Sequence, residues 1–339
     1  MSKGCAVLNN RLIVMTLFCN LFVGVAYGSG HSASGLVTTA GASGAEPVSA
    51  SHRDFSCAAN GEAADDVMTV QTTLAGVPAI LRVPKVIRKP PIVLWHGLGS
   101  PAGESELMKA LPLDDVPALK VYLGLPLFGA RAPSGDAESL ARRQGEDYAS
   151  RIFELVVVGA AKELPAVLKV LREKRCLGPN DEIGLFGFSA GGTAALIALT
   201  EPEVHVRAAV TVNAPIGLSA AIDAMERATK RPYTWTESAR QLAERSDSIR
   251  HAADIASGVP PRALLLFHGA DDTVVAPSGA VSLREALQPY YRRSGNDLRL
   301  KLVIAPGVSH DWTQPRPLQQ LRASVANWFN KYLYPANWS

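Results

Sequence analysis

Short apolar runs alternate with longer amphipathic stretches along most of the chain. A continuous apolar run such as Ile92–Trp95 is typical of a buried parallel strand, whose side chains meet a helix layer on both faces. The strands expected on this basis are 68–72, 79–83, 92–95, 119–123, 182–186, 208–212, 263–267 and 298–304. The helices expected between and after them are 151–174 with a kink at Pro165, 190–200, 220–228, 237–255, 278–293 and 318–331. This alternation predicts an α/β fold with a mostly parallel central sheet and helices on both faces.

Two segments depart from the alternation. Residues 29–60 are rich in Ser, Gly and Ala without apolar periodicity, and we interpret them as a flexible lead-in to a domain over 61–339. Residues from about 215 to 260 are polar, favour helices and contain no strong strand pattern. They are too long for an ordinary connection. We therefore expect them to form a small helical cap over the strand ends.

The N-terminal 28 residues have the pattern of a secretory signal peptide. Lys3 and Arg11 precede an apolar run over 12–26, and small residues at Ala26 and Gly28 fit a cleavage site. The apolar run is shorter than the roughly 20 residues that span a bilayer, so an uncleaved anchor is the less favoured alternative. We expect an exported protein, periplasmic or secreted, with no stable membrane span after cleavage.

Charge and cysteine content narrow the picture further. After residues 1–28 are removed, the chain has 32 basic and 31 acidic residues. It therefore lacks the excess of positive charge that is typical of nucleic-acid-binding proteins. Cys57 and Cys176 remain, and they could form one disulfide or stay as two free buried thiols. No group of residues has the ligand spacing of a zinc site, so we expect neither metal nor organic cofactor. Nothing in the sequence predicts the oligomeric state.

The sharpest motif is Gly187-Phe188-Ser189-Ala190-Gly191, between an apolar strand and a helix. A serine hydroxyl needs exposure and a base to become nucleophilic. A tight strand-to-helix turn supplies the exposure, and it requires small residues such as Gly187 and Gly191 on either side of Ser189. No lysine follows the glycines as a phosphate-binding loop would require. We therefore predict Ser189 as a nucleophile.

A second glycine-containing loop, His96-Gly97-Leu98-Gly99, follows the strand at 92–95. Glycines such as Gly97 let backbone amides approach a bound acyl group closely. We predict that the amides of Leu98 and Ala190 form an oxyanion hole. His96 is expected to pack or hydrogen-bond beneath the loop rather than act as the base.

The base and its carboxylate are expected late in the chain, after strands. Among the seven histidines, His310 follows the last strand on a loop, where sites of such sheets gather. The others lie in the lead-in, in polar surroundings or at the start of another motif: His31, His52, His96, His205, His251 and His268. Asp271 and Asp272 follow the strand at 263–267, and either could orient the imidazole.

These motifs resemble the α/β-hydrolase superfamily, and within it the group of dienelactone hydrolase-like and prolyl oligopeptidase-like enzymes, over roughly residues 65–335. That group typically shows His-Gly-x-x-Asp-x-x-Val after the seventh strand, and the pattern runs here from His268 to Val275. The resemblance implies Asp272 as the triad acid and the chain order Ser, Asp, His. Dienelactone hydrolases have a cysteine nucleophile where this chain has Ser189, and prolyl oligopeptidases carry a large β-propeller for which we expect no room.

The function expected from these features is a serine hydrolase that cleaves a small or medium carboxylic ester through an acyl-enzyme. Alternatives are an acyltransferase or a peptidase-like hydrolase with the same triad, and a non-catalytic exported binding protein. Arg131 could bind an acidic substrate group, although a solvated loop position is favoured. Aromatic residues could line an acyl pocket or pack between cap and core: Tyr233, Trp235 and Trp312.

Overall fold

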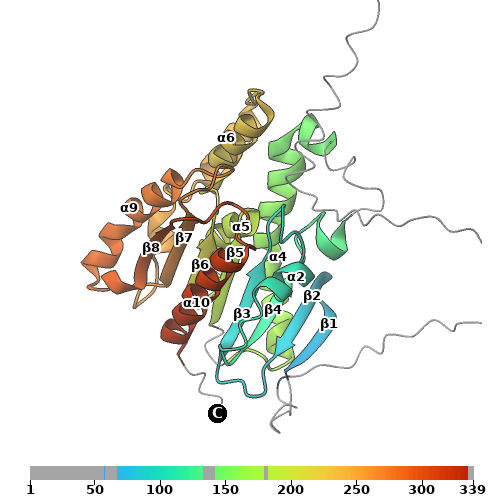
Figure 1. Cartoon of the computed structure of the whole chain (residues 1–339), viewed down its shortest axis with the longest axis vertical. Coiled ribbons are helices and arrows are strands. Elements are labelled where there is room, and N and C mark those ends of the chain that lie inside the picture. The colour runs from blue at the N-terminus through green and yellow to red at the C-terminus, as the bar shows by residue number, and fades with distance from the viewer. Residues whose placement is uncertain (1–56, 58–66, 133–141, 179–181, 335–339) are drawn as a thin grey trace, which may run out of the picture.

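The computed structural model describes residues 57, 67–132, 142–178 and 182–334 (Figure 1). In these ranges a single sheet of eight strands has the order β1-β2-β4-β3-β5-β6-β7-β8. The strands are β1 (Met68–Leu74), β2 (Val77–Val83), β3 (Lys89–Trp95), β4 (Ala118–Leu123), β5 (Ile183–Phe188), β6 (Val206–Val212), β7 (Ala263–Gly269) and β8 (Leu300–Ala305). Strand β2 runs antiparallel to β1 and β4, and all pairs from β4 through β8 are parallel. The expected α/β-hydrolase architecture, a mostly parallel sheet, is confirmed.

Helices cover both faces of the sheet (Figure 1). They include α2 (Glu104–Ala110), the 3-10 turn η2 (Gly129–Arg131), the π-helix η3 (Ala149–Val158), α4 (Gly159–Glu173), α5 (Ala190–Ala198), α6 (Leu218–Thr229), α7 (Glu237–Ser246), α8 (Ala252–Ile255), α9 (Ser278–Arg293), the 3-10 turn η4 (Asp297–Arg299) and α10 (Pro315–Tyr332). One face packs against η3, α4, α5 and α9, and the other against α2 and α10.

The alternation of side chains in β3 shows how the two cores form. Val93 and Trp95 belong to the apolar cluster on the α4 and α5 side, whereas Ile92 and Leu94 belong to the cluster on the α10 side. All four are buried, because a central strand has a helix layer on each face. A continuous apolar run is therefore the sequence pattern of this strand.

Two expected elements differ from the structure for local reasons. The helix expected over 151–174 consists of η3 and α4, and the change of hydrogen-bond pattern falls at Gly159, while α4 continues through Pro165. The helix expected over 237–255 is two helices, because it ends at Ser246 and Asp247 is extended. The side chain of Asp247 accepts a hydrogen bond from the amide of Ile249, a turn that competes with the helix.

Helices α6, α7 and α8 make up the segment between β6 and β7 in which the sequence predicts a small helical cap. The proposed signal peptide over 1–28 and the lead-in over 29–60, apart from Cys57, lie outside the described residues. Among the helices that the structure does describe, none combines the length and the apolar character needed to cross a bilayer.

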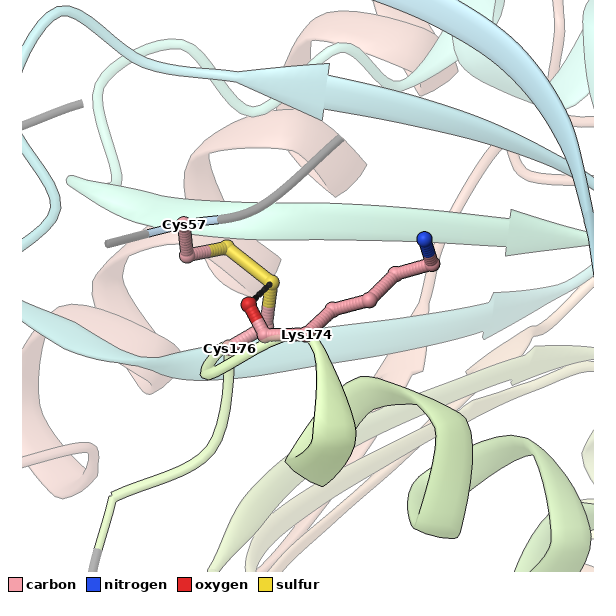
Figure 2. Close-up of a disulfide and its surroundings, with 3 residues drawn as sticks. All are labelled: Cys57, Lys174 and Cys176. Carbon is pink, nitrogen blue, oxygen red and sulfur yellow. Dashed lines mark hydrogen bonds between the residues drawn. A yellow bond between two sulfur atoms is a disulfide. The ribbon is translucent and has the colours of Figure 1, made fainter. Parts of the chain in front are cut away.

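A disulfide joins Cys57 to Cys176 (Figure 2). Their Cα atoms lie 5.0 Å apart, and the bond links positions 119 residues apart in sequence. The amide of Cys57 also donates to the carbonyl of Lys174 over 3.1 Å. Of the two alternatives that the sequence left open, the structure therefore has the paired cysteines, which attach Cys57 to the end of α4.

Candidate active site

Ser189 lies between β5 and α5 in a strained backbone conformation, with φ 51° and ψ −119°. Its neighbours make this turn sterically permissible. A Cβ atom on Gly187 would lie 2.1 Å from the carbonyl oxygen of Gly191, and one on Gly191 would lie 2.3 Å from that of His96. Only glycine fits at these two positions without displacing the backbone. The turn presents Ser189 at the wall of a cavity at the carboxyl end of the parallel strands.

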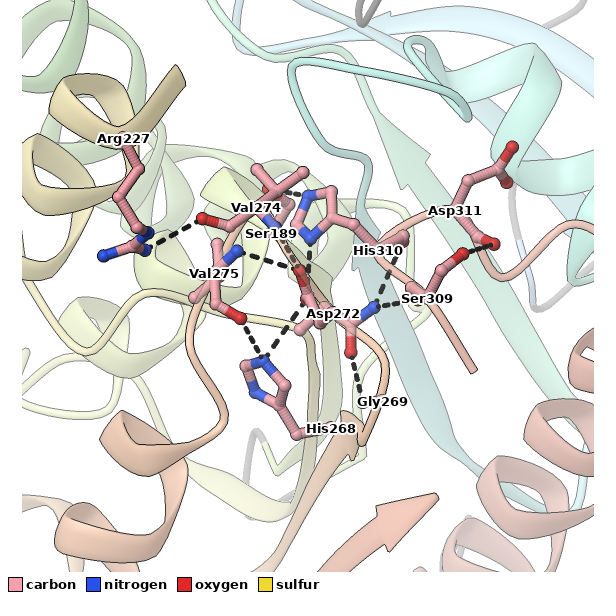
Figure 3. A network of polar contacts seen from close by, with 11 residues as sticks. Ser189, Arg227, His268, Gly269, Asp272, Val274, Val275, Ser309, His310 and Asp311 are labelled. Carbon is pink, nitrogen blue, oxygen red and sulfur yellow. Dashed lines mark hydrogen bonds and ion pairs between the residues drawn. The ribbon is translucent and has the colours of Figure 1, made fainter. Parts of the chain in front are cut away.

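The structure brings Ser189, His310 and Asp272 together from three different loops (Figure 3). His310 Nε2 lies 3.1 Å from Ser189 Oγ, and His310 Nδ1 lies 2.8 Å from Asp272 Oδ2. Because an ionised carboxylate only accepts hydrogen bonds, the Nδ1 atom carries the proton and Nε2 is free to accept the serine proton. This hydrogen-bonded order suits a serine nucleophile and its base.

Asp272 is held ionised by its hydrogen-bond partners. Its Oδ1 atom accepts from the amides of Val274 and Val275, at 2.9 and 2.8 Å, and Oδ2 also lies 3.3 Å from His268 Nε2. Burial by itself raises the pKa of Asp272, but hydrogen bonds from His268, His310 and Val275 outweigh it and hold the pKa well below its ordinary value. Asp272 therefore faces His310 as a carboxylate.

Asp271, the competing acidic neighbour, is exposed. Its backbone amide donates to the carbonyl of Val308. Among the interactions of the described residues, the carboxylate that contacts His310 is that of Asp272. The geometry thus favours Asp272, as the resemblance implied.

His96 lies fully buried beneath the loop that follows β3. Its Nδ1 atom donates to the carbonyl of Gly97 over 2.7 Å, and Nε2 accepts from the amide of Leu125 over 3.1 Å. Desolvation lowers the pKa of His96 to about 4, with the bond to Gly97 opposing the shift. The neutral ring therefore supports the loop, as expected from the sequence.

The loop and the helix start both reach the cavity. Leu98 and Ala190 line it beside Ser189. A Cβ atom on Gly97 would lie 2.7 Å from the ring of Phe188, so glycine lets this loop pack directly onto the strand end. The ring of Phe188 in turn lies 5.3 Å from that of His310. These contacts set the position of the expected oxyanion loop relative to Ser189.

The cavity has a volume of about 360 Å³, within the range of small-molecule sites. Its wall combines the loop after β3, the helix η3 and the face of α6 that points toward Ser189. The apolar part of the lining includes Leu98, Tyr148, Phe153, Val157, Ala221, Ala224 and Met225. The cap helix α6 thus forms one side of the site.

Residues considered for substrate contact from sequence have other roles. Trp312 is fully buried and packs edge-on against Phe188 at 5.5 Å. The hydroxyl of Tyr233 donates to Asp147 over 2.5 Å, and its ring packs edge-on against Trp235. Arg131 is partly buried and forms two hydrogen bonds of 2.7 Å with Glu163, so its guanidinium is already paired with a carboxylate of the protein.

Two residues hold the site together in ways that the sequence did not predict: Asn213, which it did not single out, and His268, which it placed only at the start of a motif. Asn213, buried at the end of β6, donates from Nδ2 to the carbonyls of Ser309 and His310 and accepts from the amide of Gly269. His268 donates from Nε2 to the carbonyl of Val275 over 3.0 Å. Their positions directly after or within strand ends were the available signal, because such ends meet at the site.

The described ranges contain no group of three or more His, Cys, Asp or Glu side chains arranged to hold a metal ion.

Comparisons with known proteins agree with this architecture. The family model of the prolyl oligopeptidase family matches residues 141–335, more than half of the 339-residue chain. Comparison of the sequence with curated proteins gave no match.

Solved structures from several organisms share the fold. TT1662 from Thermus thermophilus aligns with a TM-score of 0.58 and 20% identity over 77% of this chain and 98% of that one. A puromycin-hydrolyzing peptidase of Mycobacterium tuberculosis aligns with a TM-score of 0.57 and 18% identity over 79% of this chain. Carboxyl esterase 2 of Tuber melanosporum aligns with a TM-score of 0.54 and 16% identity over 80% of this chain. The alignment covers 39% of the peptidase and 89% of the esterase, so the chain spans well under half of the peptidase. On the match of the family model, the chain belongs to the prolyl oligopeptidase family and is a serine hydrolase with the α/β-hydrolase fold.

Proposed function

We propose that this protein is a carboxylic ester hydrolase that acts on small or medium esters through an acyl-enzyme. The observation that carries the proposal is the continuous relay from Ser189 through His310 to Asp272, at the wall of a mainly apolar cavity of about 360 Å³. A cavity of this size and lining suits a compact, partly apolar substrate.

In the first step, Ser189 Oγ attacks the ester carbonyl carbon while its proton passes to His310 Nε2. The carbonyl oxygen takes up the negative charge, and we assign its stabilisation to the backbone amides of Leu98 and Ala190. The tetrahedral intermediate then breaks the bond to the leaving oxygen, which receives the proton from His310. The alcohol leaves, and the acyl group remains on Ser189.

In the second step, water attacks the acyl-enzyme and gives its proton to His310. Breaking the bond to Ser189 Oγ returns that proton to the serine and releases the carboxylic acid. One ester and one water thus give one acid and one alcohol. Asp272 stays ionised throughout. Its hydrogen bond with His310 Nδ1 stabilises the imidazolium that forms in both steps.

A peptidase is the second candidate, since the matching family model is that of the prolyl oligopeptidase family. The puromycin-hydrolyzing peptidase shares the fold, but more than half of its length has no counterpart in the alignment. The ester proposal draws support from carboxyl esterase 2, which aligns over 89% of its own length.

Matched substrates separate these candidates. We expect wild type to hydrolyse p-nitrophenyl esters of graded acyl length and to leave the corresponding p-nitroanilides nearly intact. Ser189→Ala should abolish ester turnover and labelling by a fluorophosphonate probe. Equal rates for wild type and Ser189→Ala would refute the assignment, whereas faster cleavage of the anilides would favour a peptidase. A product that shifts to the acyl adduct when an alcohol or amine is added would indicate an acyltransferase.

We further propose that the protein is exported. The Cys57–Cys176 disulfide supports this location, because such bonds persist mainly in oxidising compartments. Sequencing the N-terminus of the protein expressed with its first 28 residues tests the proposal. A mature N-terminus near residue 29 is expected, and an intact Met1 on the cellular protein would count against export.

A further inference from the structure

The charged side chains that line the catalytic cavity are unevenly balanced. Arg227 and Lys230, both on the last turn of α6 or directly after it, contribute two positive charges, and Asp311 contributes one negative charge. The Oδ1 atom of Asp311 already accepts hydrogen bonds from the amide and hydroxyl of Thr313. Within the described lining, the net charge around the catalytic serine is therefore positive.

Arg227 is held in place without being neutralised. Its Nη2 atom donates to the carbonyl of Val274 over 3.0 Å, which fixes the side chain beside the loop that carries Asp272 (Figure 3). Across the described ranges no carboxylate lies within ion-pair distance of Arg227 or Lys230. The remaining guanidinium donors of Arg227 are thus available to a ligand.

Two other fixed arginines of this protein, Arg131 and Arg207, have an internal carboxylate as partner. Arg131 makes paired hydrogen bonds with Glu163, and Arg207 with Glu182. Glu163 takes the bidentate position that the guanidinium of Arg131 offers, whereas Nη1 of Arg207 alone donates to both carboxylate oxygens of Glu182. At Arg227 that position has no internal occupant, although the side chain is anchored. A carboxylate of a ligand could occupy this bidentate position on the Arg227 guanidinium.

The face of α6 that looks into the cavity also changes character along its length. Ala221, Ala224 and Met225 form the inner, apolar part, and the exposed cations follow at Arg227 and Lys230. Residues three and four apart share one side of a helix, so this face offers apolar contact and then positive charge. Positive side chains near a helix C-terminus also stabilise the helix, a role that any test must separate from binding.

We propose that the substrates of this site are esters that carry a negatively charged group, a carboxylate above all, beside their apolar part. This inference rests on the proposed ester hydrolysis. Ser189 and its relay act on the ester carbonyl, the apolar lining holds the hydrocarbon portion, and Arg227 with Lys230 binds the anion.

Matched ester pairs test the proposal on the intact chain. Mono-p-nitrophenyl adipate and p-nitrophenyl hexanoate differ in a carboxylate on the acyl part, and 4-acetoxybenzoate and 4-acetoxybenzamide differ in one on the leaving group. For at least one pair, we expect the ratio of kcat/KM for the anionic over the neutral ester to fall about three- to tenfold in Arg227→Gln/Lys230→Gln, mainly through KM. Arg231→Gln, which removes an exposed neighbouring charge outside the cavity lining, is the matched control.

The outcomes separate the proposals. An unchanged ratio for both pairs, or an equal fall in Arg231→Gln, would overturn the anionic substrate class. An equal loss of kcat on neutral and anionic esters would also overturn it, because Arg227 would then act only by holding the Val274 loop. If the double variant fails to fold, the single variant Lys230→Gln replaces it. Added salt must then lower the ratio of kcat/KM for the anionic over the neutral ester more in wild type than in Lys230→Gln. Failure of wild type to cleave any of these esters, neutral or anionic, would instead refute ester hydrolysis itself.

Discussion

Asn213 Nδ2 lies 3.1 Å from the carbonyl oxygen of His310, so a buried amide at the end of β6 holds the backbone of the proposed base. The same nitrogen lies 2.9 Å from the carbonyl oxygen of Ser309. Asn213 Oδ1 accepts from the amide of Gly269 at the end of β7. One side chain thus ties the His310 loop to two strands. It acts as a positioning residue, because it has no direct contact with the Ser189 hydroxyl among these bonds.

Asn213→Asp should lower kcat by about 10- to 100-fold with little change in KM. The new carboxylate oxygen would face two carbonyl oxygens and push the His310 loop away, and a displacement of about 1 Å can cost about 100-fold in rate. Steady-state kinetics measure the effect. Asn296→Asp removes an amide donor to a carbonyl on an exposed loop and should keep wild-type kcat. A normal kcat in Asn213→Asp would contradict this role.

Asp272→Asn and Asp271→Asn form a second matched pair. An asparagine at 272 can still accept from the amides of Val274 and Val275, but it cannot hold His310 in the required tautomer. We expect turnover to fall by about 10⁴ in Asp272→Asn, the size of effect seen when a triad carboxylate is replaced by its amide. Turnover in Asp271→Asn should stay within about twofold, since surface changes have small effects. The opposite order of rates would move the carboxylate role to Asp271.

Most of the sheet could be predicted from the sequence because its central parallel strands, β3 to β7, are buried on both faces. The expected strand at 92–95 and the motif around Ser189 follow from local patterns, an apolar run and closely spaced glycines. The chemistry of Ser189 was likewise inferred from its place between a strand and a helix. Its contact with His310, 121 residues away in sequence, required the structure.

What could not be predicted depends on contacts between distant segments. Asn213 is a single polar residue after an apolar strand, and its three partners lie 56 to 97 residues away in sequence. The sequence favours a solvated loop position for Arg131, because its partner Glu163 lies on another helix, 32 residues away in sequence. The strand β3 begins at Lys89 in spite of two prolines, and its pairing with β4 shifts register between Lys89 and Ile92, where prolines cannot donate.

Gly187→Ala tests the packing of the turn at Ser189. The added methyl group would lie 2.1 Å from the carbonyl oxygen of Gly191 and 2.6 Å from the Cα atom of Gly192, and backbone atoms cannot rotate away. We expect a loss of about 1–3 kcal/mol in the free energy of unfolding, measured in urea, and slower fluorophosphonate labelling. Gly145→Ala is the control, since nothing lies within 4 Å of the added atom there. Equal stability of the two variants would contradict the tight packing.

Removal of the disulfide should destabilise the folded protein. The bond closes a loop between positions 119 residues apart, so its loss frees a large part of the unfolded chain. We expect Cys57→Ser/Cys176→Ser to lose about 2–5 kcal/mol in the free energy of unfolding under non-reducing conditions. Reductant should lower the stability of wild type toward that of the variant and leave the variant unchanged. A wild-type protein that is insensitive to reductant, although its thiols become reactive, would contradict the prediction.

The buried ring of His96 predicts a loss of stability in mild acid. Its Nε2 atom accepts from the amide of Leu125, so a proton there would set two donors against each other. The pKa of His96 is about 4 in the folded protein, against 6.5 for an ordinary histidine. Between these values the unfolded chain binds more protons, so the free energy of unfolding falls as the pH drops through this window.

The contribution of His96 to this loss is about 3 kcal/mol between pH 7 and pH 4, because each pKa unit corresponds to about 1.4 kcal/mol. His96→Gln keeps an acceptor near Leu125 but cannot take up a proton. Its stability at pH 7 should be lower than that of wild type, since the ring packing is lost. In urea unfolding at a series of pH values, the free energy of unfolding of His96→Gln should nevertheless fall less steeply with decreasing pH than that of wild type. Parallel curves for the two proteins would show that His96 is not the group whose protonation unfolds the loop after β3.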